Sequence, residues 1–347
     1  MERRQVIATK RPTQSDVAKQ AGVSRATVSY VLNDRNGNMA ISHETRLRVL
    51  QVIEELGYQP DTRAQSLRSG DSKTIGLLIP DIHNPHFWQT VEGVEEEARK
   101  AGYDLLLAHS NANINLEDYC IQSLSRRTIS GLIIIKANKA LSPKTQKRLL
   151  ASGRPVVECS DSPSEFDAII THYRDATREA LRYLLELGHR RFAFINGVAE
   201  LVVGVDRLEP YHEVLSQAGI PEAEHNVINC GITPEEGYQA AMQLLTQVPR
   251  PTAILAINDL LAIAVLRAAT DLSLKIPQDL SVMGFDDIDL ARYLSPRLTT
   301  VFRETKFEGQ QATKLLIERL NNPELPIRVL SLPAKLVIRE STGKAPN

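Results

Sequence analysis

The chain has 347 residues, of which 42% are apolar and 24% are charged, the composition of a globular protein long enough for several domains. Three widely spaced cysteines exclude a disulfide framework and a cysteine zinc site, so we expect buried thiols in a reducing cytoplasm. No apolar run is long enough for a membrane span, and the basic start MERRQVIATKRPTQSD lacks the apolar block of a signal peptide, so we expect neither an integral membrane protein nor a secreted one.

The net charge of −1 hides an uneven distribution. Residues 1–73 carry 12 Lys and Arg against 8 Asp and Glu, a net charge of +4, and residues 74–347 carry 29 against 34, a net charge of −5. A basic N-terminal part suits contact with phosphates, although such a charge alone is also typical of an ordinary solvated surface.

The stretch TQSDVAKQAGVSRATVSYVLN, residues 13–33, predicts two short helices around a tight turn. We expect Ser15 and Ser24 to N-cap the two helices, and Gly22 to supply a turn in which a positive φ costs little. A small residue at Ala18, the turn glycine and the β-branched Val28 have the spacing of a helix-turn-helix, whose second helix enters the major groove of DNA. An ordinary helical hairpin with a polar face in water is the alternative that the residues alone leave open.

The second helix, expected from about residue 25 to 32, presents mostly short polar groups that suit base edges and phosphates. Arg25 suits either a guanine or a phosphate. The residues that we assign to DNA binding in this stretch are Thr13, Ser15, Ser24, Arg25, Ala26, Thr27, Ser29, Tyr30 and Asn33.

A third helix should follow the loop NDRNGNMA. Ser42 is its expected N-cap and Gly57 its end. Its predicted buried face consists of Leu47, Leu50, Ile53 and Leu56. The segment PDTRAQSLRSG that comes next is too short to be a stable lone helix, so by itself it indicates a linker.

From Lys73 onwards, apolar strands such as TIGLLIP alternate with amphipathic helices, which predicts two doubly wound parallel sheets. We expect one half at about residues 73–170, a second at about 171–300, and a return between the halves near 301–340. Ligands bind beyond the carboxyl ends of such strands. The strand-end residues that we assign to effector binding are Asp81, His86, Phe87, Thr171, His172, Val203, Arg207, Asn258 and Asp286. His83, Asn84, Asp259 and Asp287 also lie just past strand ends.

Some of these residues have plainer explanations. Arg207 suits a surface charge or a salt bridge, and Asp286 suits a turn cap. His83 and His86 have the spacing of a metal pair but no third ligand in sequence, so we expect no metal site and no cofactor. Trp88 is expected in a helix core.

Residues 13–70 resemble the headpiece of the lactose-repressor/galactose-repressor (LacI/GalR) family of bacterial transcription regulators, through SDVAKQAGVSRATVSYVLN, SHETRLRVLQVIEELGYQP and TRAQSLRSG, and the resemblance continues through the body. It implies an all-α headpiece at residues 1–59, a hinge helix at 60–72 and a periplasmic-binding-protein-like effector-binding and dimerisation domain at 73–347. It also implies that Arg63 and Leu67 contact DNA, with Leu67 as a wedge in the minor groove.

In the body, the same resemblance implies that Arg207 and Asp286 grip polar groups of a sugar or base, that His86 and Phe87 form an aromatic wall, and that Ile232 occupies a second aromatic position. The chain departs from the family pattern at Ile232, at Thr171 in place of an aspartate, and in the apolar loop VAELVVGVD. These departures weaken the case for a typical hexose and leave open an anionic or partly apolar ligand.

The function that we expect is a repressor-type, sequence-specific transcription regulator in the cytoplasm, associated with the nucleoid. It would bind a pseudo-palindromic operator as a homodimer, with an affinity set by a small effector such as a sugar, a sugar acid or another metabolite. The alternatives are a solute-binding protein, which the headpiece and the absent signal peptide oppose, and an α/β enzyme. No G-x-G-x-x-G after a strand, P-loop or G-x-S-x-G supports an enzyme.

Overall fold

A computed structural model describes residues 12–33, 41–59, 71–136, 141–160, 165–199 and 201–346, without the side chains of Asn33, Ile114, Val202 and Val203. The chain divides into two compact units, Met1–Ser72 and Lys73–Asn347, called here the headpiece and the body. The expected hinge residues Arg63 and Leu67 lie outside the described residues.

The headpiece contains the helices α1 (Gln14–Ala21), α2 (Arg25–Asn33) and α3 (His43–Leu56). The predicted cap of α1 was wrong, because Thr13 rather than Ser15 precedes the helix. The Thr13 hydroxyl accepts a hydrogen bond from the Asp16 amide at 3.3 Å, and the Asp16 carboxylate accepts one from the Thr13 amide at 2.8 Å. This reciprocal capping box needs an acidic or amide side chain three residues after the cap, which Thr13 has in Asp16 and Ser15 lacks.

The turn between α1 and α2 is as predicted. Gly22 has φ +65, in the left-handed region that glycine adopts at low cost, and Ser24 caps α2 by accepting from the Thr27 amide at 3.0 Å. The two helices therefore follow the helix-turn-helix pattern.

The core of the headpiece differs from the prediction on α3. Leu47 and Leu50 are 54% and 42% exposed, whereas Val49 and Val52 are buried against α1 and α2. Ile53 fits either helical stripe, since it is three residues from Leu50 and four from Val49, and Leu56 is four residues from Val52. The compact valines pack against Val17, Ala18 and Ala21 of α1, and the two leucines remain outside this core.

The body has two subdomains, each built on a six-stranded sheet among its described residues. The first sheet has the order β11-β5-β4-β3-β1-β2 and the second has the order β12-β10-β9-β8-β6-β7. The strands of the first sheet are β1 (Thr74–Ile79), β2 (Asp104–His109), β3 (Gly131–Ile135), β4 (Val156–Ser160), β5 (Asp167–Thr171) and β11 (Val329–Leu332). Those of the second are β6 (Phe192–Asn196), β7 (Asn226–Asn229), β8 (Ala253–Ala256), β9 (Ser281–Phe285), β10 (Thr299–Arg303) and β12 (Ala334–Val337).

The expected fold of two doubly wound parallel sheets is confirmed, with β12 as an antiparallel addition beside β10. Central strands are buried along their whole length, as their continuous apolar sequences require. The described chain passes between the sheets at three places: after β5, after β10 and between β11 and β12. These passages hold the two subdomains side by side with a cleft between them.

Helices cover both faces of each sheet. In the first subdomain they are α5 (His86–Lys100), α6 (Ile114–Arg126), α7 (Pro143–Ser152) and α12 (Thr305–Asn321). In the second they are α8 (Tyr173–Glu186), α9 (Val202–Gln217), α10 (Pro234–Leu245) and α11 (Asp259–Asp271), with short 3-10 turns at Glu222–Glu224 and Asp289–Arg292. One apolar cluster joins α5 and α12 to the first sheet, and another joins α6 and α7 to its opposite face.

The pair α5 and α12 packs unusually closely. A Cβ atom on Gly93 would lie 2.1 Å from the Lys306 carbonyl oxygen, and one on Gly309 would lie 2.3 Å from the Thr90 carbonyl oxygen. Only glycine permits this approach. It fixes α12, whose N-terminus follows β10 at the cleft, firmly on the first subdomain.

Three further expectations need correction or completion. Helix α9 begins at Val202, so that much of the expected loop VAELVVGVD is helical and Arg207 lies inside the helix. Trp88 is 44% exposed and is not a core residue. All three cysteines are free, with Cys159 buried and the other two half-buried.

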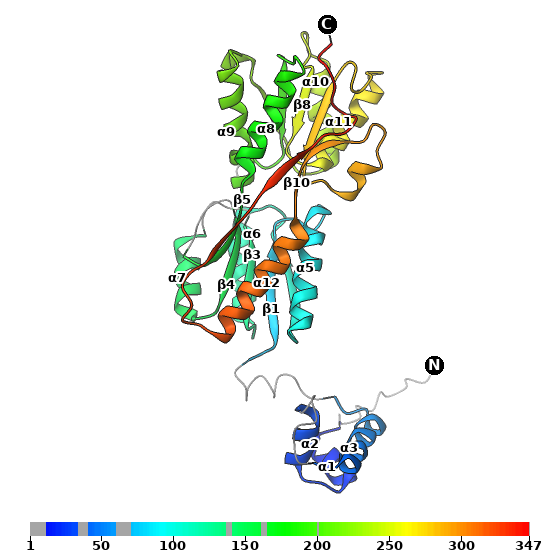
Figure 1. Cartoon of the computed structure of the whole chain (residues 1–347), viewed down its shortest axis with the longest axis vertical. Coiled ribbons are helices and arrows are strands. Elements are labelled where there is room, and N and C mark those ends of the chain that lie inside the picture. The colour runs from blue at the N-terminus through cyan, green and yellow to red at the C-terminus, as the bar shows by residue number, and fades with distance from the viewer. Residues whose placement is uncertain are drawn as a thin grey trace, which may run out of the picture. The chain divides into compact units, whose positions relative to one another are not determined.

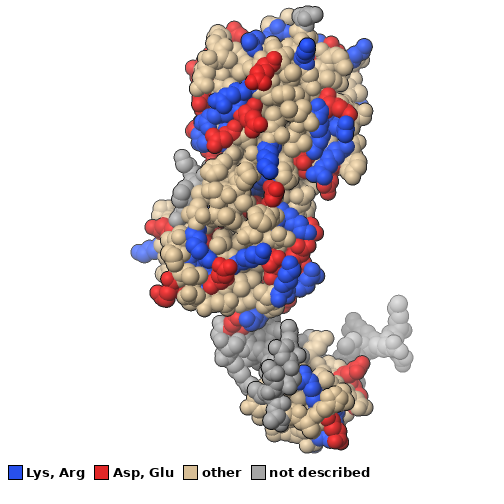
Figure 2. Space-filling model, in the orientation of Figure 1, with Lys and Arg blue, Asp and Glu red and all other residues tan. Residues whose placement is uncertain are grey.

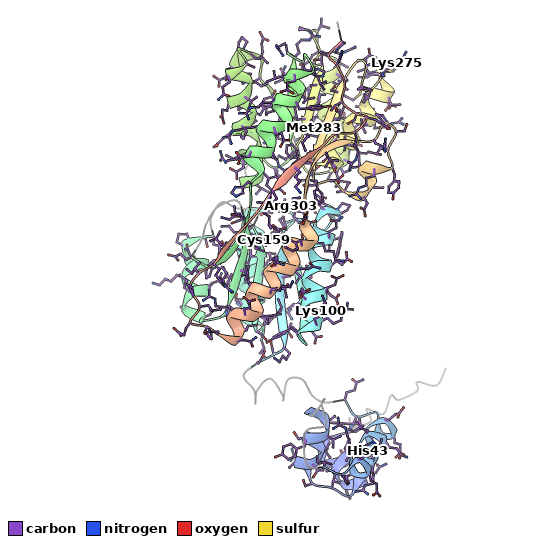
Figure 3. All side chains as sticks on the ribbon, viewed as in Figure 1. His43, Lys100, Cys159, Lys275, Met283 and Arg303 are labelled. Atoms are coloured by element: carbon purple, nitrogen blue, oxygen red, sulfur yellow. The ribbon has the colours of Figure 1, made fainter. Side chains whose placement is uncertain are left out.

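No described helix has the length and apolar character that a bilayer crossing requires. Acidic and basic side chains are interspersed on the face of the body drawn in Figure 2. Figure 3 places Cys159 and Arg303 near the junction of the two subdomains.

Candidate functional site

The outward face of α2 is the first candidate site. Arg25, Ala26 and Tyr30 are exposed, and with Gln14 and Ser29 they line a shallow hollow on the headpiece surface. Exposed side chains at these positions can reach base edges or phosphates when the helix lies in a major groove.

The other expected DNA-binding residues have different settings. The hydroxyls of Ser24 and Thr27 contact each other at 2.9 Å at the start of α2, while Thr13 and Ser15 are exposed at the start of α1. The side chain of Asn33 is not among those described.

The second candidate site is a cavity of about 90 Å³ in the cleft between the two subdomains of the body. Seven of the expected effector residues line it, which are Asp81, His86, Phe87, Arg207, Ile232, Asn258 and Asp286. Two others do not line it: Thr171 is buried in β5, and His172 is exposed. The side chain of Val203 is not described.

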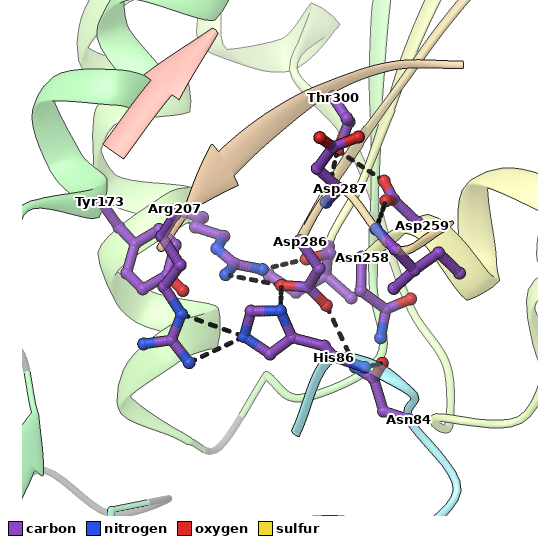
Figure 4. A network of polar contacts seen from close by, with 12 residues as sticks. Asn84, His86, Tyr173, Arg207, Asn258, Asp259, Asp286, Asp287 and Thr300 are labelled. Carbon is purple, nitrogen blue, oxygen red and sulfur yellow. Dashed lines mark hydrogen bonds and ion pairs between the residues drawn. The ribbon is translucent and has the colours of Figure 1, made fainter. Parts of the chain in front are cut away.

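Asp286 is the residue at which the two subdomains meet. Its carboxylate accepts a hydrogen bond from Asn84 Nδ2 at 3.0 Å, and it lies 3.7 Å from both His86 Nδ1 and the Arg207 guanidinium (Figure 4). Its backbone has φ +106, which is rare for a residue with a side chain. Such strain is retained where the surrounding structure requires a particular orientation, and here it turns the carboxylate into the cleft.

Arg207 is held rigidly on the second subdomain. It is 3% exposed, donates to the carbonyl oxygen of Ile257, and stacks between Tyr173 and Phe285, whose ring centres lie 4.5 and 4.4 Å from its guanidinium carbon. Its Nε–H has no hydrogen-bond partner among the described residues. A buried donor without a partner is costly, so this N–H is suited to a ligand oxygen.

His86, at the start of α5 in the first subdomain, contacts Arg303 and Asp286 of the second subdomain. Its Nε2 accepts from Arg303 Nε at 3.0 Å, so its proton is on Nδ1, facing Asp286. Burial lowers the pKa of His86 to about 4, so the ring is neutral at physiological pH. Arg303 is also paired with Glu308 at 3.1 Å, and burial raises the pKa of that carboxyl.

Asn84, which the sequence places just past a strand, also lines the cavity. Four polar or aromatic residues of the cavity were missed from the sequence, which are Lys136, Ser160, Tyr173 and Arg303. Lys136 directly follows β3 and Arg303 ends β10, so the strand-end rule applied to every strand would have found both. Lys136 pairs with Glu158 at 3.1 Å, and both are almost fully buried. The role of Tyr173 is visible only in its stacking on Arg207.

The described residues contain no group of three or more His, Cys, Asp or Glu placed to hold a metal ion. The cavity combines polar groups with apolar sides at Phe87 and Ile232.

Comparison with known proteins decides the family. Residues 13–61 match the model of bacterial regulatory proteins of the lacI family, and residues 181–342 match a periplasmic binding protein-like domain. The ribose operon repressor of Haemophilus influenzae is 34% identical over 331 residues, covering 95% of this chain and 98% of its own length. The chain belongs to the LacI family.

Other LacI-family members are similar over the same extent. The HTH-type transcriptional repressor PurR of Photorhabdus laumondii is 34% identical over 339 residues, covering 96% of this chain and 98% of its own. The lac repressor dimer bound to operator and the anti-inducer ONPF has a TM-score of 0.82 at 28% identity, covering 96% of this chain and all of that one. A ribose-bound LacI-family regulator of Enterococcus faecium has a TM-score of 0.70 at 30% identity, covering 78% and 99%.

These comparisons confirm the predicted family, fold and general function. The chain is a LacI-family transcription regulator with a helix-turn-helix DNA-binding headpiece and a body of the kind that binds a small effector. Its characterised relatives are repressors and not enzymes.

Proposed function

We propose that this LacI-family protein is a repressor that binds a pseudo-palindromic operator as a homodimer and whose operator affinity is set by a small polyhydroxylated effector in the cleft. The unpartnered Nε–H of the rigid, buried Arg207, next to the strained Asp286, is the observation that carries the effector part. Together they offer a donor and an acceptor to neighbouring hydroxyls of one ligand.

The effector is a neutral sugar or sugar derivative rather than an anion, because each cation of the cavity already has a carboxylate partner. Lys136 is paired with Glu158, Arg303 with Glu308, and Arg207 with Asp286. A ligand with a negative charge would compete with these carboxylates, whereas hydroxyl groups can both donate to Asp286 and accept from Arg207. The ribose found in similar structures agrees with this class.

Binding would act through the contacts that cross the cleft. Asn84 of the first subdomain donates a hydrogen bond to Asp286 of the second. A ligand hydroxyl that takes this acceptor changes how the subdomains sit, and so favours one of two arrangements with different operator affinity. The hinge segment at residues 60–72, which includes Arg63 and Leu67, would transmit this change to the headpiece. The DNA-contacting residues of α2 would then bind the operator with a different affinity.

The protein has no catalytic role in this proposal, and its binding to chromosomal DNA places it in the cytoplasm. The adjacent Asp286 and Asp287 are not a proton-sharing pair, since Asp287 is paired with Arg339 at 2.6 Å and with Arg292 at 3.2 Å. Asp286 instead faces Asn84 and the cavity.

The test combines a mobility-shift assay on DNA flanking the gene with calorimetry against neutral sugars, sugar acids and sugar phosphates. We expect a neutral sugar to bind and to change operator affinity. Arg207→Ala should weaken the binding of that sugar by about tenfold or more and leave operator binding intact. Arg182→Ala, which removes an exposed arginine from α8, is the control. Equal effector affinity in the Arg207→Ala protein and the wild type contradicts the proposal.

A further inference from the structure

We propose that the groove between α6 and α7, on the face of the first subdomain opposite α5 and α12, is a second ligand site, which binds the phosphate group of a small metabolite. It lies outside the effector cleft and shares no lining residue with it. It is thus independent of the proposed sugar effector.

The groove contains a cavity of about 190 Å³. Gln122, Ser125 and Arg126 of α6 face Thr145 and Arg148 of α7 across it, and Ile121 and Leu149 form its apolar floor. On each helix the lining positions recur after three or four residues, as from 122 to 125 and 126 and from 145 to 148 and 149, so they lie on the facing sides of two neighbouring helices.

Two hydroxyls in this groove have no hydrogen-bond partner within the described part of the chain. Thr145 is 1% exposed, its Oγ1 is unpartnered, and the Oγ of Ser125 on the opposite wall is also buried and unpartnered. Two buried hydroxyls that face one cavity are costly unless a ligand or water satisfies them. They therefore indicate a polar occupant.

The rim of the groove is basic although the body as a whole is acidic. Arg126 and Arg148 line the cavity. Three more exposed cations are adjacent in sequence to lining residues: Arg127, directly after α6, and Lys144 and Lys147 on α7. None of these five forms an ion pair with the residues that the structure describes. Glu165, which contacts α7, accepts a hydrogen bond from Gln146 at 2.8 Å.

The combination of two arginines and two hydroxyls favours phosphate among anions. A phosphate monoester presents three acceptor oxygens in a tetrahedral arrangement, which two guanidinium groups and two hydroxyl donors can satisfy together. A flat acidic protein surface would use the exposed cations but would leave the buried Thr145 hydroxyl without a partner. A small phosphorylated molecule can satisfy both.

The site can be tested by calorimetry on the full-length protein in phosphate-free buffer. Inorganic phosphate, ribose 5-phosphate and ribose are titrated into the wild type and into Arg207→Ala. We expect saturable binding of ribose 5-phosphate in both proteins, since the groove does not use Arg207. Binding of inorganic phosphate as well would show that the phosphate group is sufficient for recognition.

Variants then locate the site. Arg126→Gln/Arg148→Gln should weaken phosphate binding by about tenfold or more, while Arg182→Gln/Lys275→Gln, with the same change in net charge at exposed positions of the second subdomain, should not. Thr145→Val should also weaken phosphate binding. Thr145→Ser keeps the hydroxyl and should leave phosphate binding unchanged.

The proposal is overturned if no phosphate compound binds saturably, or if binding is equal in the groove variants and the control pair. It is also overturned if Arg126→Gln/Arg148→Gln instead loses operator affinity without any phosphate compound present, because the cations would then contact the DNA backbone. Loss of ribose 5-phosphate binding in Arg207→Ala alone would place that ligand in the cleft, so this inference and the proposed effector site fail in different ways.

Discussion

Asn84 Nδ2 lies 3.0 Å from the carboxylate of Asp286, and this hydrogen bond joins the loop before α5 in one subdomain to the end of β9 in the other. Both residues are at least nine-tenths buried, so the bond is shielded from water. The hydrogen bond therefore holds the two sides of the cleft together.

Replacement of Asn84 by aspartate should open the cleft. The change places a second carboxylate beside Asp286 in a buried setting, where two like charges repel strongly. Small-angle scattering of the ligand-free body should then show a larger radius of gyration than in the wild type. Asn115→Asp, at an exposed position on α6, should leave the scattering unchanged. Identical curves for Asn84→Asp and the wild type would show that this bond does not hold the cleft closed.

The stability of the body should depend on pH through His86. Its pKa is about 4 in the folded protein, against 6.5 for the unperturbed ring, chiefly because of burial. As the pH falls from about 6.5 towards 4, the unfolded chain therefore takes up a proton that the folded chain does not, and the free energy of unfolding decreases by about 3 kcal/mol. Above pH 7 this contribution is constant.

The measurement is urea denaturation of the wild type and His86→Gln across that pH range. Glutamine can still accept from Arg303 but does not titrate, so the difference between the two proteins should shrink or reverse as the pH falls. Other buried groups, such as His189, whose pKa burial also lowers, titrate in both proteins and cancel. A constant difference from pH 7 to 4 would rule out His86 as the titrating group.

Breaking the buried ion pair of Lys136 and Glu158 should lower the free energy of unfolding strongly, whereas replacing both residues by apolar ones should lower it little. Glu158→Gln leaves the ammonium of Lys136 in the interior without its counter-charge, which should lower the free energy of unfolding by about 3 kcal/mol. The double variant Lys136→Met/Glu158→Leu should recover most of this loss. Glu340→Gln is the control, because it breaks an ion pair whose side chains are 57% and 51% exposed and should have a far smaller effect. A double variant no more stable than Glu158→Gln would contradict the electrostatic explanation.

Arg25 should contribute to operator binding, and its variant can separate two modes of contact. If the side chain contacts a guanine, Arg25→Ala should lose affinity mainly for the true operator, by about 1–3 kcal/mol. The variant should then no longer distinguish that guanine from another base at the same position. If it holds a phosphate, affinity falls for all duplexes and the salt slope decreases by about one. Lys19→Ala, which removes an exposed cation from α1, is the comparison in a fluorescence anisotropy assay. No effect of Arg25→Ala on either quantity would remove Arg25 from the DNA-binding surface.

The sequence was informative where one local rule decides the structure. Gly22 and Ser24 have the roles that turn and capping chemistry predict, and strand-end positions such as Arg207, Asn258 and Asp286 do meet in one cavity. Local rules were weaker where two solutions compete. Thr13 and Ser15 are both good caps, and only the position of Asp16 favours Thr13.

Long-range relationships could not be predicted in this way. The stacking of Arg207 between Tyr173 and Phe285 joins three elements that are separate in sequence, and nothing in the local pattern of any of them indicates it. The unpartnered hydroxyl of Thr145 likewise depends on the distance between α6 and α7, which a periodicity does not give.

The strands β11 and β12 add a consequence for synthesis. They are formed by residues from Val329 to Val337, yet they complete the edges of two sheets whose first strands begin at Thr74 and Phe192. Neither sheet can be finished until the ribosome has translated almost the whole chain, whereas the apolar cluster of α1, α2 and α3 needs only the first 58 residues. During translation, the part that reads DNA is therefore ready well before the part that responds to a metabolite.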